Sequence, residues 1–194
     1  MTREAFLMRA TLAAGATYGA MSATPYISRA LAQEGEGDVD ILNFALTLEY
    51  LESTFYEMAV KEVSGLSKGE KELAEKLLDD ENAHVKALMA TIKDLDGTPV
   101  KKPTFDFGGA FGDRATFLKT SNTLEDTGVS AYNGAAPMIK SKDVLAAAGS
   151  IVQVEARHAA LIRLVREKPP APLAFDKASP MDDVVEAITP FIKS

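Results

Sequence analysis

The stretch VQVEARHAAL, residues 152–161, places a carboxylate and an imidazole three positions apart among mainly apolar residues. The same spacing recurs in DDENAHVKAL, residues 79–88, so both histidines of the chain follow a glutamate by three residues. Residues three apart lie on one face of an α-helix, and here that face is otherwise apolar. Both Glu-x-x-His pairs are therefore predicted to point into a helical core. The pairs are Glu81 with His84 and Glu155 with His158.

The motifs lie in a chain whose apolar residues recur with helical periodicity in four long segments. The expected helices cover roughly residues 38–64, 67–96, 113–140 and 141–168. Ser67 and Glu70 form a capping box at the start of the second helix. Ser141 or Asp143 is expected to cap the fourth. Residues 97–112 are rich in glycine and proline, so they are expected to form a long connection.

A short loop, a long crossover and a short loop between long helices are typical of one class of four-helix bundle. We therefore predict an all-α bundle over residues 33–168, followed by a Pro-rich tail over residues 169–194. In this tail Ser179 is expected to cap a short amphipathic helix that has Pro180 in its first turn. That helix either covers the bundle or docks on a partner or a twin subunit.

The first 32 residues have the pattern of an export signal, with arginines near the start, a weakly apolar stretch and ALA at residues 30–32. TREAFLM, residues 2–8, resembles the twin-arginine consensus, although Glu4 stands where the second arginine belongs. We expect an exported protein, periplasmic or extracellular, that is cleaved near Ala32. The alternatives are a retained amphipathic helix and a membrane anchor, but the apolar run is too short and polar for a stable span.

Composition narrows the range of partners. The 194 residues carry a net charge of −7, and a strongly acidic chain without a basic patch is not expected to bind nucleic acid. The chain has no cysteine, which excludes disulfides, thiolate metal sites and cysteine nucleophiles. The expected ligands are cations.

Each of the four expected helices carries one glutamate on its apolar face, roughly half-way along its length. These glutamates are Glu49, Glu81, Glu125 and Glu155. Packing antiparallel helices would bring the four carboxylates and both imidazoles into one layer. Burying ionised carboxylates costs several kcal/mol each, and a domain has only about 5–15 kcal/mol of stability. Two divalent cations would balance the four charges, and carboxylates with one imidazole per ion suit iron or manganese.

An internal repeat supports a site with two similar halves. LEYLESTFY, residues 48–56, and LEDTGVSAY, residues 124–132, both place a tyrosine seven residues after the glutamate. Seven residues are nearly two helical turns, so Tyr56 and Tyr132 share the faces of Glu49 and Glu125. The halves differ at the third position after the glutamate, where Glu52 corresponds to Gly128.

The arrangement resembles the ferritin-like di-iron and di-manganese carboxylate proteins, in which two helices supply a glutamate and two supply Glu-x-x-His. ILNFALTLEYLE, LEDTGVSAY and IVQVEARHAA are similar to phrases of exported bacterial ferritin-like proteins related to desiccation-related proteins. The resemblance covers residues 38–168. It implies a ferritin-like four-helix bundle that holds two metal ions, and it leaves a homo-oligomer open.

The resemblance also implies a role for each inward residue. Glu81 and Glu155 would bridge the metals, Glu49 and Glu125 would each bind one, and His84 and His158 would supply one nitrogen per metal. Tyr56 and Tyr132 would donate hydrogen bonds to ligand carboxylates, although a role as core aromatics is the alternative.

Glu52 is interpreted as part of a solvated helix face, with an extra ligand or acid/base as the alternative. Four other acids are interpreted as surface charges or as charges that contact the ligands, and no chemistry is assigned to them. They are Glu57, Asp79, Asp80 and Asp126.

Three functions are consistent with these residues. The first is a redox protein whose paired metals act on iron(II), oxygen or peroxide in stress protection. The second is a storage or desiccation-related protein in which metal is cargo or a structural staple, and bound metal then contributes folding free energy. The third is an interaction module built on the tail helix. The chain has no cysteines that could bind a rubredoxin-type iron, which argues against a peroxidase that receives its electrons through such an iron in the same chain.

Overall fold

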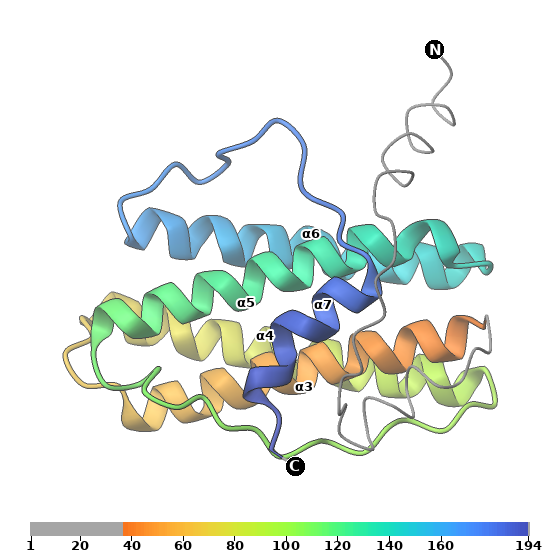
Figure 1. Cartoon of the computed structure of the whole chain (residues 1–194), viewed down its shortest axis with the longest axis horizontal. Coiled ribbons are helices and arrows are strands. Elements are labelled where there is room, and N and C mark those ends of the chain that lie inside the picture. Colours follow the sequence, from red (N-terminus) through yellow and green to blue (C-terminus); the bar gives the residue numbers. More distant parts are fainter. Residues whose placement is uncertain (1–36, 194) are drawn as a thin grey trace.

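The computed structural model describes residues 37–193, so the expected export segment and its cleavage site lie outside the described residues. Four long helices run side by side (Figure 1). They are α3 (Asp38–Glu62), α4 (Lys68–Asp94), α5 (Arg114–Ala135) and α6 (Lys142–Val165). The part of the chain that the structure describes contains no strand beyond a single isolated bridge, which confirms the predicted all-α class.

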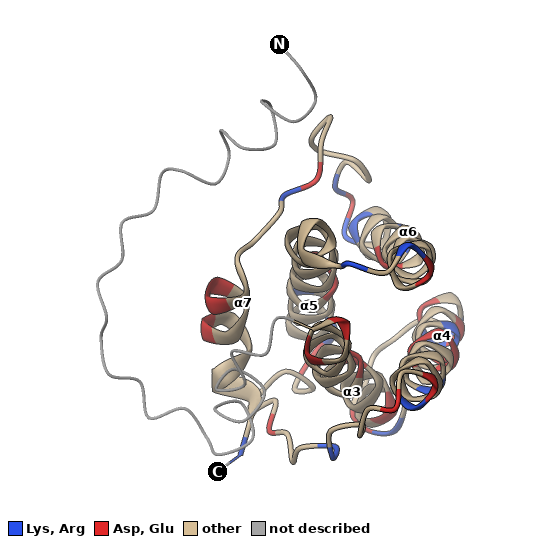
Figure 2. Cartoon of the chain, turned by 90° about the vertical axis from the view of Figure 1, so that its right-hand side faces the viewer, with Lys and Arg blue, Asp and Glu red and all other residues tan. Residues whose placement is uncertain are grey.

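The helices form two hairpins that pack on each other. The main contacts are between α3 and α4 and between α5 and α6, while α3 against α5 and α4 against α6 join the hairpins. Viewed along the bundle, the four helices occupy its four corners (Figure 2). The crossover from α4 runs the length of the bundle, so α5 begins at the end where α4 began (Figure 1). Among residues 37–193, none of the helices combines the length and apolarity needed to cross a bilayer.

The helix starts follow their predicted caps. The Ser67 hydroxyl accepts a hydrogen bond from the Glu70 amide, and the Glu70 carboxylate accepts one from the Ser67 amide. Of the two candidates for α6, Ser141 is the cap, since its side chain accepts from the Val144 amide. These bonds satisfy amides that have no partner inside the helix.

Two helices end three or more residues earlier than predicted. The α-helical part of α5 stops at Ala135, and a 3-10 turn, η1 (Ala136–Met138), follows because Pro137 has no amide hydrogen for a further α-helical bond. Helix α6 ends at Val165 rather than near residue 168. Glu167 there takes a left-handed conformation with φ of 57°, which ends the helix before the prolines.

The crossover, residues 95–113, is fastened to α3 near its start. The Asn43 side-chain amide donates to the Thr98 carbonyl at 3.2 Å, and its carbonyl oxygen accepts from the Val100 amide at 2.8 Å. At Gly97 the backbone passes so close to the bundle that a Cβ atom would lie 2.7 Å from Val39 and 2.9 Å from the Ile92 carbonyl oxygen. Only glycine fits at this turn.

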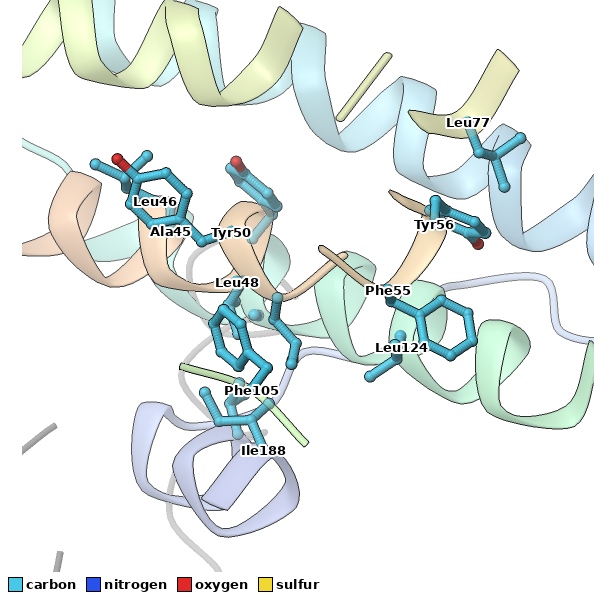
Figure 3. Packing of buried hydrophobic residues seen from close by; sticks show 14 of the residues in the cluster. Ala45, Leu46, Leu48, Tyr50, Phe55, Tyr56, Leu77, Phe105, Leu124 and Ile188 are labelled. Atoms are coloured by element: carbon cyan, nitrogen blue, oxygen red, sulfur yellow. The ribbon is translucent and has the colours of Figure 1, made fainter. Parts of the chain in front are cut away.

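The crossover then supplies aromatic rings to the core. Phe55 of α3 has Phe107 and Phe111 of the crossover at ring-centroid distances of 5.2 Å, and it stacks on Phe117 of α5 at 5.6 Å. Figure 3 shows Phe55 next to Leu124 and Phe105 next to Ile188 of the tail. The long connection thus covers the α3 side of the bundle with apolar groups and leaves the bundle centre to other residues.

The C-terminal tail packs on its own bundle. Helix α7 (Met181–Ile188) and the 3-10 turn η2 (Thr189–Phe191) bury Val184, Val185 and Ile188 against the core, and Figure 2 shows α7 beside α3 and α5. Of the two roles considered for the tail helix, the structure therefore shows that it covers the bundle. The prediction that Ser179 caps this helix is wrong. Pro180 takes the cap position, and the Ser179 amide instead donates to the Ser130 carbonyl of α5 at 2.9 Å.

Candidate metal centre

The four helices bring six inward side chains together at the middle of the bundle. All four glutamates are 0% exposed, while His158 is 3% and His84 is 8% exposed. Each helix supplies one glutamate, and α4 and α6 also supply the imidazoles. The set is Glu49, Glu81, His84, Glu125, Glu155 and His158. Helical periodicity turns each of these residues inward, and the packing of the four helices then brings them into one layer.

Two overlapping groups of potential ligands lie in this set. One consists of Glu49, Glu81, His84 and Glu155, and the other of Glu81, Glu125, Glu155 and His158. In each group one ligand atom from every residue lies within 4.8 Å of the others. Glu81 and Glu155 belong to both groups, so their carboxylates lie between the two.

His84 faces three carboxylates at once. Its Nδ1 atom lies 2.9 Å from Glu155 Oε1 and 3.2 Å from one oxygen each of Glu49 and Glu81. Burial would lower the pKa of His84, but contacts with Glu155, Glu49 and Glu81 raise it to about 12. Without a bound cation, the imidazole is therefore protonated at neutral pH and supplies part of the missing positive charge.

His158 is placed similarly but has an additional partner. Its Nδ1 atom lies 2.9 Å from Glu81 Oε1 and 3.4 Å from Glu125 Oε2. Burial lowers the pKa of His158, but Glu125 and Glu81 raise it to about 11. On the other side of the ring, Nε2 donates to Asp80 Oδ2 at 3.1 Å. This bond fixes which nitrogen turns toward the glutamates.

Asp80 thus belongs to the site, although no chemistry was assigned to this residue from the sequence. It also pairs with Lys76 on α4. Burial raises the pKa of Asp80, but Lys76 and His158 outweigh it and lower that pKa overall. No local sequence pattern could have singled out Asp80, because its partner His158 lies 78 positions away on another helix. The other three of these acids, Glu57, Asp79 and Asp126, are exposed.

Two tyrosines hold the outer carboxylates from opposite hairpins. The Tyr132 hydroxyl donates to Glu49 Oε1 at 2.5 Å, and the Tyr56 hydroxyl donates to Glu125 Oε1. Tyr56 also shares a 2.6 Å hydrogen bond with the hydroxyl of Ser121, a residue one turn before Glu125 that no sequence motif had singled out. Burial raises the pKa of both phenols well above 10.0, so they stay protonated and donate.

Glu52 also points inward, and the interpretation of a solvated face is wrong. It is only 2% exposed, and burial followed by the charge of Glu155 raises its pKa well above the usual value. Its counterpart Gly128 lies opposite. A Cβ atom at Gly128 would lie 3.0 Å from Glu52 Oε1 and 3.4 Å from Glu155 Oε2. The glycine leaves the space in which the Glu52 carboxylate lies.

The carboxylates of the cluster differ in how readily they ionise. Burial raises the pKa of Glu49 to about 8, and it raises that of Glu155 strongly. Glu81 is also buried, but contacts with His158 and His84 lower its pKa to about 2. Among the ion pairs of residues 37–193, those to the buried carboxylates of this cluster come from the two imidazoles alone. If all four carboxylates were ionised, the site would therefore carry four negative charges against at most two positive ones.

The donor set fits a metal ion. Within the described residues, several buried atoms of the cluster have no hydrogen-bond partner, including both oxygens of Glu155, Oε1 of Glu81 and Oε2 of Glu125. Nδ1 of His158 also lacks one, since its 2.9 Å approach to Glu81 does not have hydrogen-bond geometry. Buried polar atoms are normally paired. Here oxygen and imidazole nitrogen atoms share one space, as in sites for iron, manganese or zinc.

Fold and cluster together define a four-helix bundle with a buried carboxylate and imidazole site for divalent metal. The family model for the ferritin-like domain matches residues 37–168, so the chain belongs to this family. This agrees with the resemblance noted in the sequence. A search of curated proteins found no match.

A solved structure with a similar fold is the bacterioferritin-related protein from Bacteroides fragilis, described as a dodecameric thioferritin. It is 22% identical, with a TM-score of 0.61, and the match covers 73% of this chain and 93% of that one. At this identity the similarity establishes the ferritin-like fold.

Proposed function

We propose that the protein binds two divalent metal ions, iron or manganese, in the cluster at the bundle centre. The observation that carries the proposal is the pair of overlapping four-residue groups that share Glu81 and Glu155. Two such groups with two common carboxylates match two cations bridged by glutamates. Four ionised carboxylates and two divalent ions also cancel in charge, which removes most of the cost of burying them.

Each residue of the cluster has a role in this proposal. Glu81 and Glu155, which belong to both groups, would hold both ions. Glu49 and His84 would complete one position, and Glu125 and His158 would complete the other. The phenols of Tyr132 and Tyr56 hold Glu49 and Glu125 in place, which fixes the direction of their remaining oxygen atoms. Carboxylates with one imidazole per ion favour iron and manganese over metals that prefer thiolates.

We further propose that the centre is redox-active toward iron(II), oxygen or peroxide and serves in stress protection. When bound, paired iron or manganese ions supply changes of oxidation state. The chain supplies a site that excludes bulk water, since the ligands are almost fully buried. We propose export through residues 1–32, so that the protein acts outside the cytoplasm.

The test uses metal-loaded protein. We expect purified protein to bind about two Mn(II) or Fe(II) ions per chain, as the bridged site requires, measured by elemental analysis after gel filtration. Oxygen release from peroxide and optically followed iron(II) oxidation then report activity. Glu81→Ala removes a bridging carboxylate and is expected to abolish both metal binding and activity. Wild-type protein that binds no more metal than Glu81→Ala would contradict the proposal.

A second candidate is metal storage or a structural metal staple without catalysis. The similar Bacteroides fragilis protein is a dodecameric thioferritin, which makes a homo-oligomer a concrete possibility for this chain as well. If the metal is only stored or structural, it binds stoichiometrically and raises the thermal stability, while neither activity exceeds that of Glu81→Ala. Light scattering of the purified protein measures the oligomeric state independently.

A further inference from the structure

Glu52 is a buried carboxylate that the six-residue centre does not account for. It lies one helical turn after Glu49 on α3 and is 2% exposed. Its Oε2 atom has no hydrogen-bond partner within residues 37–193. An ionised carboxylate that is buried without hydrogen bonds or a cation costs several kcal/mol, and such a group takes up a proton instead. Glu52 can therefore be ionised at this position only if a positive partner stabilises it.

The position opposite Glu52 shows where that interaction lies. Gly128 of α5 is the counterpart of Glu52 in the internal repeat, and a Cβ atom there would lie 3.0 Å from Glu52 Oε1. The same Cβ would lie 3.4 Å from Glu155 Oε2, an oxygen that also lacks a hydrogen-bond partner among the described residues. Both carboxylates therefore border the same small volume, which they can approach because residue 128 has no side chain.

We propose that Glu52 is a further carboxylate ligand of the metal centre and that Gly128 provides the space for it. The inference rests on the proposed metal binding and makes that site asymmetric, because only the α3 side supplies the additional carboxylate. Glu52 and Glu155 both place a carboxylate oxygen in this small volume. When ionised, the two carboxylates repel each other, and a cation bound by both would replace that repulsion with attraction to the ion. With Glu52 the centre offers five carboxylates, so its formal ligand charge is one unit more negative than two divalent ions require.

The experiment compares wild type with Glu52→Gln, which keeps the size of the side chain and removes its charge. We expect the affinity for Mn(II), measured by calorimetry and by electron paramagnetic resonance of free Mn(II), to fall at least about tenfold for one of the two ions. The melting temperature of chelator-treated Glu52→Gln is expected to rise, because an amide cannot ionise and so removes the repulsion among the buried carboxylates. A merely structural glutamate would change neither quantity in this direction.

Two matched controls isolate the effect. Glu57→Gln makes the same substitution on the same helix at an exposed residue and is expected to leave Mn(II) affinity unchanged. Gly128→Ala should weaken Mn(II) binding in the wild type, because its Cβ displaces the Glu52 carboxylate. In the Glu52→Gln background it should weaken binding no further, since that ligand is already lost.

The outcomes separate this inference from the function on which it rests. If wild type binds two Mn(II) ions and Glu52→Gln binds both with unchanged affinity, the role of Glu52 is refuted while the six-residue centre stands. If Glu52→Gln lowers the melting temperature of the chelated protein and leaves affinity intact, Glu52 is a structural residue. If wild type itself binds no Mn(II), both proposals fail.

Discussion

At the scale of single residues, the two imidazoles of the centre are not equivalent. The Nε2 atom of His158 is held by Asp80, which directly precedes Glu81. The equivalent position before Glu155 is Val154, which has no side-chain acceptor for His84. A hydrogen bond on the outer nitrogen fixes the tautomer and the orientation of a metal-binding imidazole. The His158 position is therefore the better organised of the two.

Asp80→Ala tests this difference. We expect it to lower the Mn(II) affinity of one position by roughly 10- to 100-fold, because His158 loses the partner that orients it. Asp79→Ala changes the neighbouring exposed aspartate and serves as the control. Calorimetric titration of both variants measures the effect, and equal affinities would show that Asp80 does not position the ligand.

At the scale of elements, close contact between α5 and the tail depends on a missing side chain. A Cβ atom at Gly134 would lie 1.9 Å from the Ser179 carbonyl oxygen, whereas a Cβ at Gly149 of α6 would have no atom within 4 Å. Both glycines lie within helices, where glycine is normally unfavourable relative to alanine. Gly134 is thus required by packing, and Gly149 is not.

These two positions predict substitutions of opposite effect. Gly134→Ala should lower the free energy of unfolding by about 1–3 kcal/mol, because the tail backbone must move away from α5 and α7 loses part of its packing. Gly149→Ala should raise it by roughly 0.5–1 kcal/mol, since alanine is the better helix former. Urea unfolding of both variants measures the two changes, and a Gly134→Ala protein as stable as wild type would contradict the packing argument.

At the scale of the whole molecule, the two hairpins meet at a site whose charge depends on pH. His84 and His158 have pKa values raised to about 12 and about 11, and burial raises the pKa of Glu49 to about 8. Without metal, the folded protein therefore keeps protons on these groups at pH values where the unfolded chain has already released them. The stability contributed by a group with a raised pKa is fully present below its pKa in the unfolded chain. It is lost as the pH rises through its pKa in the folded protein.

Metal binding should reverse this pH dependence. The chelated protein is expected to melt at a lower temperature at pH 8 than at pH 6, because the imidazoles and Glu49 keep protons only in the folded state. Mn(II) displaces these protons, so its affinity should increase between pH 6 and pH 8. Calorimetry in buffers of different ionisation enthalpy counts the protons released. Binding that releases no protons at pH 7 would show that the ions do not occupy this cluster.

Much of the fold and six residues of the site followed from local patterns. Helix periodicity, the Ser67 capping box and the glycine- and proline-rich crossover act over a few residues, so the sequence alone predicts them. The inward direction of both Glu-x-x-His pairs follows equally from their apolar helix faces. The ends of α5 and α6 were missed by a few residues, because Pro137 and the left-handed Glu167 intervene.

What the sequence by itself determined was which residues share a helix face, since spacing along one helix sets that relation. Only the tertiary structure decided what each face meets. Asp80 lies next to His158, 78 positions away, Glu52 lies against the space left by Gly128, and Ser179 contacts α5 instead of capping α7. These contacts depend on how separate helices are rotated and staggered against one another, which is set by packing across the bundle and by no local pattern.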